Sequence, residues 1–120
     1  MKNDIVLNKS KAFALRIIKL YQYLCEDKRE FILSKQLLRS GTSIGANIRE
    51  GKRAQSKPDF YHKLNIALKE ADETAYWLEL LHESSYITAE QYNSIYADYN
   101  EIIALLVSIT KTQKSEKNNG

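Results

Sequence analysis

The chain lacks the features on which disulfide-rich, secreted and membrane-spanning proteins depend. Its 120 residues include one cysteine, Cys25, so no internal disulfide can form and a small secreted scaffold is excluded. The longest apolar run, from Ile102 to Val107, is far shorter than the ~20 residues that a transmembrane helix needs. The first residues, MKNDIVLNKSK, are interrupted by charge too early to hold the apolar stretch of a secretory signal. We therefore expect a cytoplasmic protein that makes no use of a membrane.

Residues that interrupt helices are scarce as well. Pro58 is the single proline, and the chain has four glycines. No segment alternates apolar and polar residues over the length of a strand, and no turn dipeptide separates two β-rich runs. With 43% hydrophobic residues, the chain is long enough to bury a core of its own, so we expect one folded domain. These features predict an all-α fold.

Four segments carry apolar residues at every third or fourth position, which is the spacing of one face of an α-helix. The predicted core stripes are Phe13, Ile17, Leu20 and Leu24; Ser34, Leu37, Gly41, Ile44 and Ile48; Phe60, Leu64, Ala67, Ala71, Thr74, Leu78 and Leu81; and Tyr92, Ile95, Tyr99, Ile102, Leu106 and Ile109. The first helix is predicted to start near Ser10, and the second to span about residues 30–51. The third is predicted to be capped by Ser56 or Asp59, with Pro58 in its first turn. The fourth is predicted to begin with a capping box of Thr88 and Gln91.

The connections between these segments are short, so consecutive helices must run antiparallel. We therefore predict an antiparallel up-down-up-down four-helix bundle that forms a single domain over residues 1–110. Residues 111–120 have no apolar side chain and are predicted to form a disordered polar tail.

A di-iron site is the first enzymatic hypothesis, because carboxylate-bridged sites in bundles use Glu-x-x-His motifs on two different helices. The chain has one such motif, from Glu79 to His82, and a similar one from Asp59 to His62. Both lie on the third predicted helix and cannot meet in one site. Acidic neighbours at a helix end disfavour a reactive thiolate at Cys25, and no glycine-rich phosphate loop is present. We expect no catalytic residue, no metal, no cofactor and no small-molecule substrate.

Gly41 and Gly45 lie on one face of the second predicted helix, where each glycine costs about 1 kcal/mol relative to alanine. We interpret the pair as a close-packing position. The expected neighbour is a bulky residue such as Trp77 or a tyrosine of the fourth helix, within the bundle or across a subunit contact. In the same helix, Asn47 is expected to hydrogen-bond a neighbouring helix end, and Gly51 to leave the helical conformation.

The net charge of +3 conceals an asymmetry between the two halves of the chain. Residues 1–57 carry 13 basic and 5 acidic side chains, a net charge of +8, whereas residues 58–120 carry 5 and 10, a net charge of −5. A basic half of this kind favours contacts with phosphate, or with the acidic half of the same or a neighbouring subunit.

The basic residues that we predict to contact nucleic acid gather at the end of the second helix and in the loop after it, with two more earlier in that helix. They are Arg49, Lys52, Arg53 and Lys57, supported by Arg39 and Lys35. Contacts with phosphate are favoured by the release of counterions. Three tyrosines of the fourth helix could stack on bases, but acidic residues surround them, so we expect them in the core or at an interface. They are Tyr92, Tyr96 and Tyr99.

The segment from Gln36 to Leu81 has a distinctive pattern. It is carried by Gln36, Leu37, Arg39, Ser43, Ile44, Asn47, Ile48, Glu50, Gly51, Asp59, Phe60 and Glu73. On these residues the chain resembles the bacterial four-helix-bundle family named for proteins encoded by intervening sequences in 23S rRNA genes. The resemblance implies an up-down bundle and a ring-shaped homo-oligomer, most often a pentamer. A related bundle, the accessory protein of diversity-generating retroelements, forms such a ring and works with nucleic acid and a reverse transcriptase.

The residues and the resemblance together lead us to expect a non-enzymatic protein that assembles into a homo-oligomeric ring and binds RNA or DNA. The alternative is a protein–protein interaction or accessory module that binds no nucleic acid. In that case the charge asymmetry would serve subunit pairing alone.

Overall fold

The computed structural model describes residues 1–119, with side chains up to Gln113. It contains four helices: α1 (Lys2–Glu26), α2 (Leu33–Lys52), α3 (Lys57–Glu83) and α4 (Ala89–Asn119). No strand occurs among the described residues. Over the same residues, none of the helices holds an apolar stretch long enough to cross a membrane.

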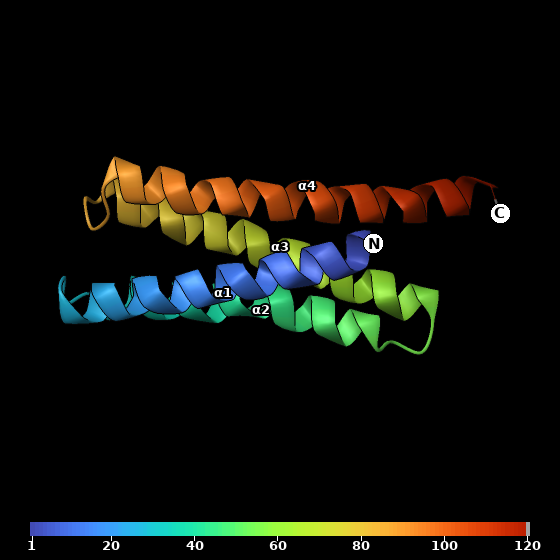
Figure 1. Ribbon diagram of the computed structural model, residues 1–120, viewed down its shortest axis with the longest axis horizontal. Coiled ribbons are helices and arrows are strands. Elements are labelled where there is room, and N and C mark those ends of the chain that lie inside the picture. The colour runs from blue at the N-terminus through green and yellow to red at the C-terminus, as the bar shows by residue number, and fades with distance from the viewer. Residues whose placement is uncertain (120) are drawn as a thin grey trace.

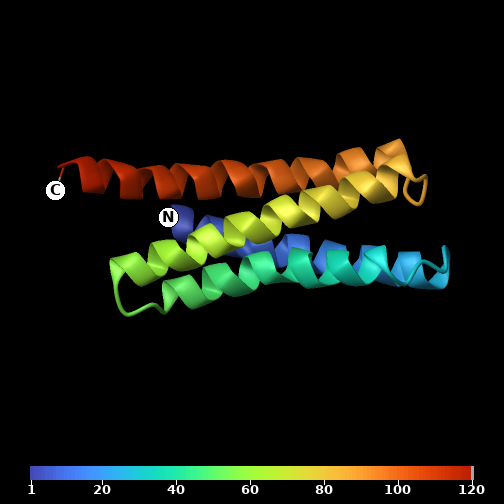
Figure 2. The same cartoon turned by 180° about the vertical axis from the view of Figure 1, so that it is seen from behind.

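Each helix runs antiparallel to the next, and the chain forms an elongated bundle of 52 × 23 × 21 Å (Figure 1). Every helix packs on its neighbours in sequence, and α4 closes the bundle by packing on α1. The diagonal pairs, α1 with α3 and α2 with α4, bring no two Cα atoms within 8 Å of each other among the described residues. The predicted up-down-up-down four-helix bundle is therefore confirmed. Figure 2 shows from behind how α3 lies between α2 and α4.

The starts of α3 and α4 follow local capping chemistry. The hydroxyl of Ser56 accepts a hydrogen bond from the backbone N–H of Asp59 at 3.2 Å, and Pro58 occupies the first turn of α3. Ahead of α4, the N–H of Thr88 donates to the side chain of Gln91 at 2.8 Å, and the N–H of Gln91 donates to the hydroxyl of Thr88 at 3.1 Å. Both predicted caps are present.

The starts of α1 and α2 differ from the predictions. Helix α1 begins at Lys2 rather than near Ser10, because the core stripe extends upstream through the buried Val6. Helix α2 begins at Leu33 rather than near Glu30. The chain turns at Arg29, whose φ of 54° is left-handed, and Glu30 then uses its side chain to satisfy the first backbone N–H groups of α2.

Helix α4 continues to Asn119, beyond the end predicted near Thr110. Its last turns include lysine, glutamine and glutamate residues, which are good helix formers, but these turns have no apolar stripe from which a helix could be predicted. The predicted disorder of residues 111–120 stays a prediction, since the side chains from residue 114 onward and the whole of Gly120 lie outside the described residues.

The core is built from the predicted stripes. Its largest fully buried side chains include Phe13, Ile17, Leu24, Leu37, Ile44, Ile48, Leu64, Leu78, Leu81, Ile102 and Leu106. Small polar side chains fill the places where helices approach closely, and each is hydrogen-bonded. The hydroxyl of Thr74 donates to that of Ser40 at 3.0 Å across α2 and α3, and Ser10 donates to the carbonyl of Val6 at 2.7 Å.

Gly41 and Gly45 of α2 pack against α1, not against Trp77 or a tyrosine of α4. A Cβ atom on Gly41 would lie 2.9 Å from both γ carbons of Ile17, and one on Gly45 would lie 3.4 Å from the Cβ of Ser10. The predicted neighbours were wrong because the sequence shows which residues share one face of a helix but not which other helix packs against that face. Gly51 is also helical, since no glycine within residues 1–119 has a positive φ. It packs against α3, where a Cβ on Gly51 would lie 3.2 Å from the Cβ of Lys63. Asn47 donates to the carbonyl of Ser43 in its own helix, at 2.8 Å.

Candidate nucleic-acid interface

One face of α2 points away from the bundle and carries most of the predicted basic residues. We name it the outer face of α2; it consists of Lys35, Arg39, Thr42, Ala46 and Arg49, together with Arg53, the residue that caps the end of the helix. These positions alternate steps of four and three residues, which keeps them on one side of a helix. All are exposed except Thr42, which is half-buried. With a rise of about 1.5 Å per residue, the face extends over about 27 Å and contains no carboxylate.

Arg39 does not offer a free charge. Its guanidinium forms ion pairs with Glu73 and, at 3.3 Å, with Glu70, both on α3. The hydrogen bond with Glu73 is the main reason that the pKa of Arg39 is raised above its ordinary value. Arg39 therefore links α2 to α3, and an external anion would have to compete with Glu70 and Glu73 for its guanidinium.

Lys52 is also paired within the chain. It lies outside the outer face, because its position in the last turn of α2 turns it toward α1, where it forms an ion pair with Asp4. The hydrogen bond from Lys52, together with its charge, lowers the pKa of the Asp4 carboxyl. Two of the six predicted nucleic-acid contacts thus have carboxylate partners.

The remaining cations are distributed along the molecule. Among residues 1–113, whose side chains are described, those of Lys35, Arg49 and Arg53 form no ion pair or hydrogen bond. Lys57 begins α3, just beyond the loop that follows Arg53. The fold therefore gathers Arg49, Arg53 and Lys57 near one end of the bundle and leaves Lys35 toward the other end of α2.

A groove of about 280 Å³ lies between α1 and α2 beside the outer face. Its lining residues are Leu7, Asn8, Lys11 and Ala14 from α1 and Thr42, Gly45, Ala46 and Arg49 from α2. Lys11, which sequence analysis did not select, lies on the same groove as Arg49. No local pattern could have found it, because the two residues are brought together only by the antiparallel pairing of the helices.

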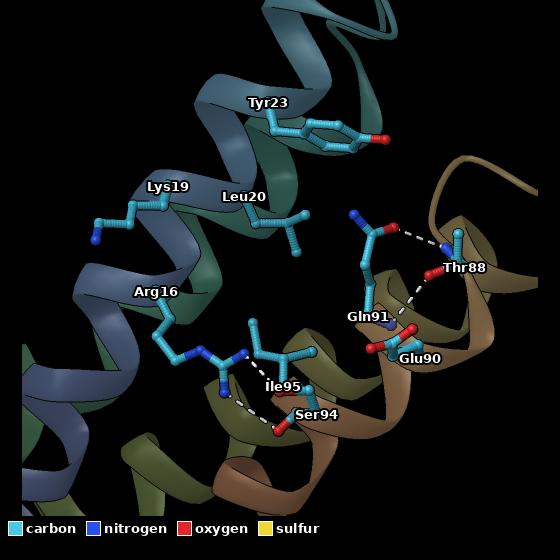
Figure 3. Close-up of a pocket in the computed structure, with 9 residues that line it drawn as sticks. All are labelled: Arg16, Lys19, Leu20, Tyr23, Thr88, Glu90, Gln91, Ser94 and Ile95. Carbon is cyan, nitrogen blue, oxygen red and sulfur yellow. Dashed lines mark hydrogen bonds between the residues drawn. The ribbon is translucent and has the colours of Figure 1, made fainter.

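A larger groove, of about 700 Å³, separates the last turns of α1 from the first turns of α4 (Figure 3). Arg16 reaches across it from α1 and donates to Asp98 at 2.6 Å and to the hydroxyl and carbonyl oxygens of Ser94 at 2.9 and 3.1 Å. Figure 3 shows Lys19 extending away from α4, while Glu90 supplies an acidic group on the other wall. The charged groups of this groove thus include an arginine, Arg16, whose guanidinium is already hydrogen-bonded to Asp98 and Ser94.

The tyrosines of α4 make tilted ring contacts with one another, in a row that begins at His82 of α3. His82 stacks on Tyr92 with a centroid separation of 4.5 Å, and the row continues to Tyr96 at 5.1 Å and from there to Tyr99 at 4.9 Å. Tyr99 is buried, and burial is the main reason that its pKa rises to about 12; the charge of Asp72 adds to the effect. The row packs the α3–α4 seam and does not present open ring faces to bases.

The groups considered for catalysis are not assembled into a site. Among the described residues, no three side chains of the His, Cys, Asp and Glu types gather as they would around a metal ion. His82 is engaged in the stack on Tyr92, and the half-buried Cys25 lies with its sulfur 3.9 Å from the hydroxyl of Ser34. His82 and Cys25 are thus both in contact with neighbouring side chains, whereas the cations of the outer face of α2 are exposed.

Comparisons with known proteins agree with this fold. Residues 2–108 match the family model of the 23S rRNA-intervening sequence protein. The chain is also similar to a protein of unknown function from the S23 ribosomal protein family, from Bacteroides thetaiotaomicron VPI-5482, whose crystal structure superposes with a TM-score of 0.91. The two share 61% sequence identity, and the match covers 92% of this chain and 99% of the other. No curated protein matches the chain. The chain belongs to the 23S rRNA-intervening sequence protein family.

Proposed function

We propose that this protein is a non-enzymatic, cytoplasmic scaffold that binds RNA or DNA through the outer face of α2. The observation that carries the proposal is the set of exposed cations on that face, Lys35, Arg49 and Arg53, which have no acidic partner among the described side chains. Phosphate contacts by such side chains gain free energy from counterion release. Arg53 and Lys57 extend the basic surface past the end of α2.

The paired cations have a secondary role in this proposal. Arg39 is held by Glu70 and Glu73, and Lys52 by Asp4. A phosphate must compete with these carboxylates, so Arg39 and Lys52 contribute less to nucleic-acid binding than Arg49 and Arg53 do. These ion pairs are partly exposed and therefore weak, so a phosphate can replace the carboxylates.

The proposed assembly is a homo-oligomeric ring, with the pentamer as the expected form. Its support is the family resemblance and the opposite net charges of the two halves of the chain, since a head-to-tail contact can bring a basic face against an acidic one. A ring would place several copies of the outer face of α2 on one particle, which raises the affinity for a long strand by avidity.

A salt-dependent binding assay tests the nucleic-acid proposal. Fluorescence anisotropy of a labelled single-stranded RNA is measured with the wild type, with the double variant Arg49→Ala/Arg53→Ala and with the control Lys69→Ala/Lys111→Ala. The control removes two exposed cations from α3 and α4 and so changes the net charge equally. We expect the first variant to lose at least about tenfold in affinity at low salt, and the slope of log K against log salt to fall by about 1.4, or 0.7 per lost contact.

Two results would contradict the proposal. The first is an absence of RNA or DNA affinity in the wild type at low salt, which favours the second candidate, a protein-interaction module. The second is an equal loss of affinity in both double variants, which would show that binding depends on net charge and not on the outer face of α2. Phe31 and Ile32 support the second candidate, because their side chains are 50% and 77% exposed at the tip of the α1–α2 loop, where apolar residues are suited to contact another protein.

A further inference from the structure

We infer that the groove between α1 and α2 is a binding site for the sugar-phosphate backbone of a nucleic-acid strand, with one phosphate held between Lys11 and Arg49. The inference rests on the proposed function and adds a site to it, since Lys11 lies on α1, outside the basic cluster at the end of α2.

The groove exists because small residues line the place where α1 and α2 pack closely. Gly45 has no side chain to fill the space beside Ser10, and Ala14 and Ala46 add only methyl groups. The resulting volume of about 280 Å³ suits a sugar and its phosphate rather than a base pair. The groove also borders the outer face of α2, because Thr42, Ala46 and Arg49 belong to both.

The charges around the groove all have one sign. Lys11 and Arg49 are its charged lining residues, and neither forms an ion pair or hydrogen bond among residues 1–113. The groove between α1 and α4 differs in the sign and in the pairing of its charges. Its wall includes the carboxylate of Glu90, and Arg16 forms an ion pair with Asp98. A phosphodiester therefore meets two unpaired cations and no carboxylate in the first groove, whereas in the second it meets the paired Arg16, Lys19 and the carboxylate of Glu90.

Polar groups complete the site. The hydroxyl of Thr42 donates to the carbonyl of Leu38 at 2.7 Å, which leaves its oxygen as an acceptor for a ribose hydroxyl. Asn8 is exposed on the opposite wall and brings an amide that can donate to a phosphate oxygen. Contacts of this kind fix the position of a strand without reading its sequence. A strand bound here can continue along the outer face of α2 toward Arg53.

The test uses the single variant Lys11→Ala with Lys19→Ala as its matched control. Both residues are exposed lysines of α1 that form no ion pair among the described side chains, but Lys19 belongs to the other groove. With the full chain and a labelled single-stranded RNA at low salt, we expect Lys11→Ala to weaken binding about threefold to tenfold and to lower the salt slope by about 0.7. Lys19→Ala should stay within about twofold of the wild type.

A second pair of variants blocks the groove with charge. Ala46→Glu puts a carboxylate on its rim, and Ala12→Glu puts one on an exposed site of α1 outside it. Both positions are exposed and helical, and glutamate is a good helix former, so circular dichroism should show unchanged folding. We expect Ala46→Glu to reduce RNA affinity at least about tenfold and Ala12→Glu much less, since the repulsion depends on distance.

The outcomes separate this inference from the proposed function. If Arg49→Ala/Arg53→Ala loses RNA binding while Lys11→Ala behaves like Lys19→Ala, the groove is not the site and the outer face of α2 remains the interface, whatever the effect of Ala46→Glu, because Ala46 belongs to both surfaces. If the wild type binds no RNA at low salt, the proposed function itself is wrong. Loss of binding in both groove variants, with intact controls, supports the site.

Discussion

Glu30 shows how one side chain shapes the start of a helix. Its carboxylate accepts hydrogen bonds from the backbone N–H groups of Ile32 at 3.1 Å, Leu33 at 3.0 Å and Ser34 at 2.7 Å. Burial alone would raise the pKa of this carboxyl, but the hydrogen bonds outweigh it, and the pKa lies below its ordinary value of 4.5. The charged form of Glu30 therefore stabilises the folded state.

The first prediction follows from the sign of this shift. A carboxyl whose pKa is lower in the folded protein adds stability above its unfolded pKa and loses it as the pH falls through the folded pKa. We expect Glu30→Gln to reduce the free energy of unfolding by about 1 kcal/mol at pH 7, the usual size of a lost helix cap, and by less near pH 3. Urea titrations followed by the fluorescence of Trp77 measure both values.

Glu26→Gln is the control for this prediction. Glu26 is an exposed residue at the end of α1 and makes no such backbone contacts. An equal, pH-independent loss of stability in Glu30→Gln at pH 7 and pH 3 would show that the charge of Glu30 does not cap α2.

At the scale of the elements, the packing of α2 on α1 depends on two glycines that are in unequal surroundings. A Cβ on Gly41 would press on the γ carbons of Ile17, which are attached directly to a buried branch point and cannot swing away. A Cβ on Gly45 would be in ordinary contact with Ser10. The same mutation should therefore have opposite effects at positions one helical turn apart.

We expect Gly41→Ala to lower the free energy of unfolding by about 1–2 kcal/mol, because the cost of overpacking exceeds the gain in helix propensity. Gly45→Ala should leave stability unchanged or raise it by up to about 1 kcal/mol. Urea unfolding followed by circular dichroism gives both values. Similar destabilisation by the two mutations would mean that α1 and α2 lie closer at Gly45 than the contact with Ser10 indicates.

At the scale of the whole molecule, the opposite charges of the two halves are partly neutralised inside one bundle. Lys9 and Arg16 of α1 form ion pairs with Glu101 and Asp98 of α4, and Arg39 of α2 pairs with α3. Each pair is partly exposed, so it contributes little to stability. The pairs nevertheless remove charge that would otherwise be available to a neighbouring subunit or to nucleic acid.

The proposed ring leads to the prediction at this scale. Multi-angle light scattering should give the mass of a ring for the wild type and for Arg49→Ala/Arg53→Ala, if the outer face of α2 serves nucleic acid and not assembly. A double variant that dissociates would assign Arg49 and Arg53 to subunit pairing. A wild type that is monomeric at micromolar concentration would contradict the ring itself.

The sequence by itself determined the number of helices, most of their buried stripes and the capping box of Thr88, and it narrowed the cap of α3 to Ser56 or Asp59, because these depend on residues only three or four positions apart. It could not determine which cations are free. Arg39 and Lys52 look equivalent to Arg49 along the chain, and only the packing of α2 on α3 and α1 supplies their carboxylate partners. The tertiary structure also decided that Gly41 meets Ile17 and that Lys11 shares a groove with Arg49, since antiparallel pairing joins residues far apart in sequence.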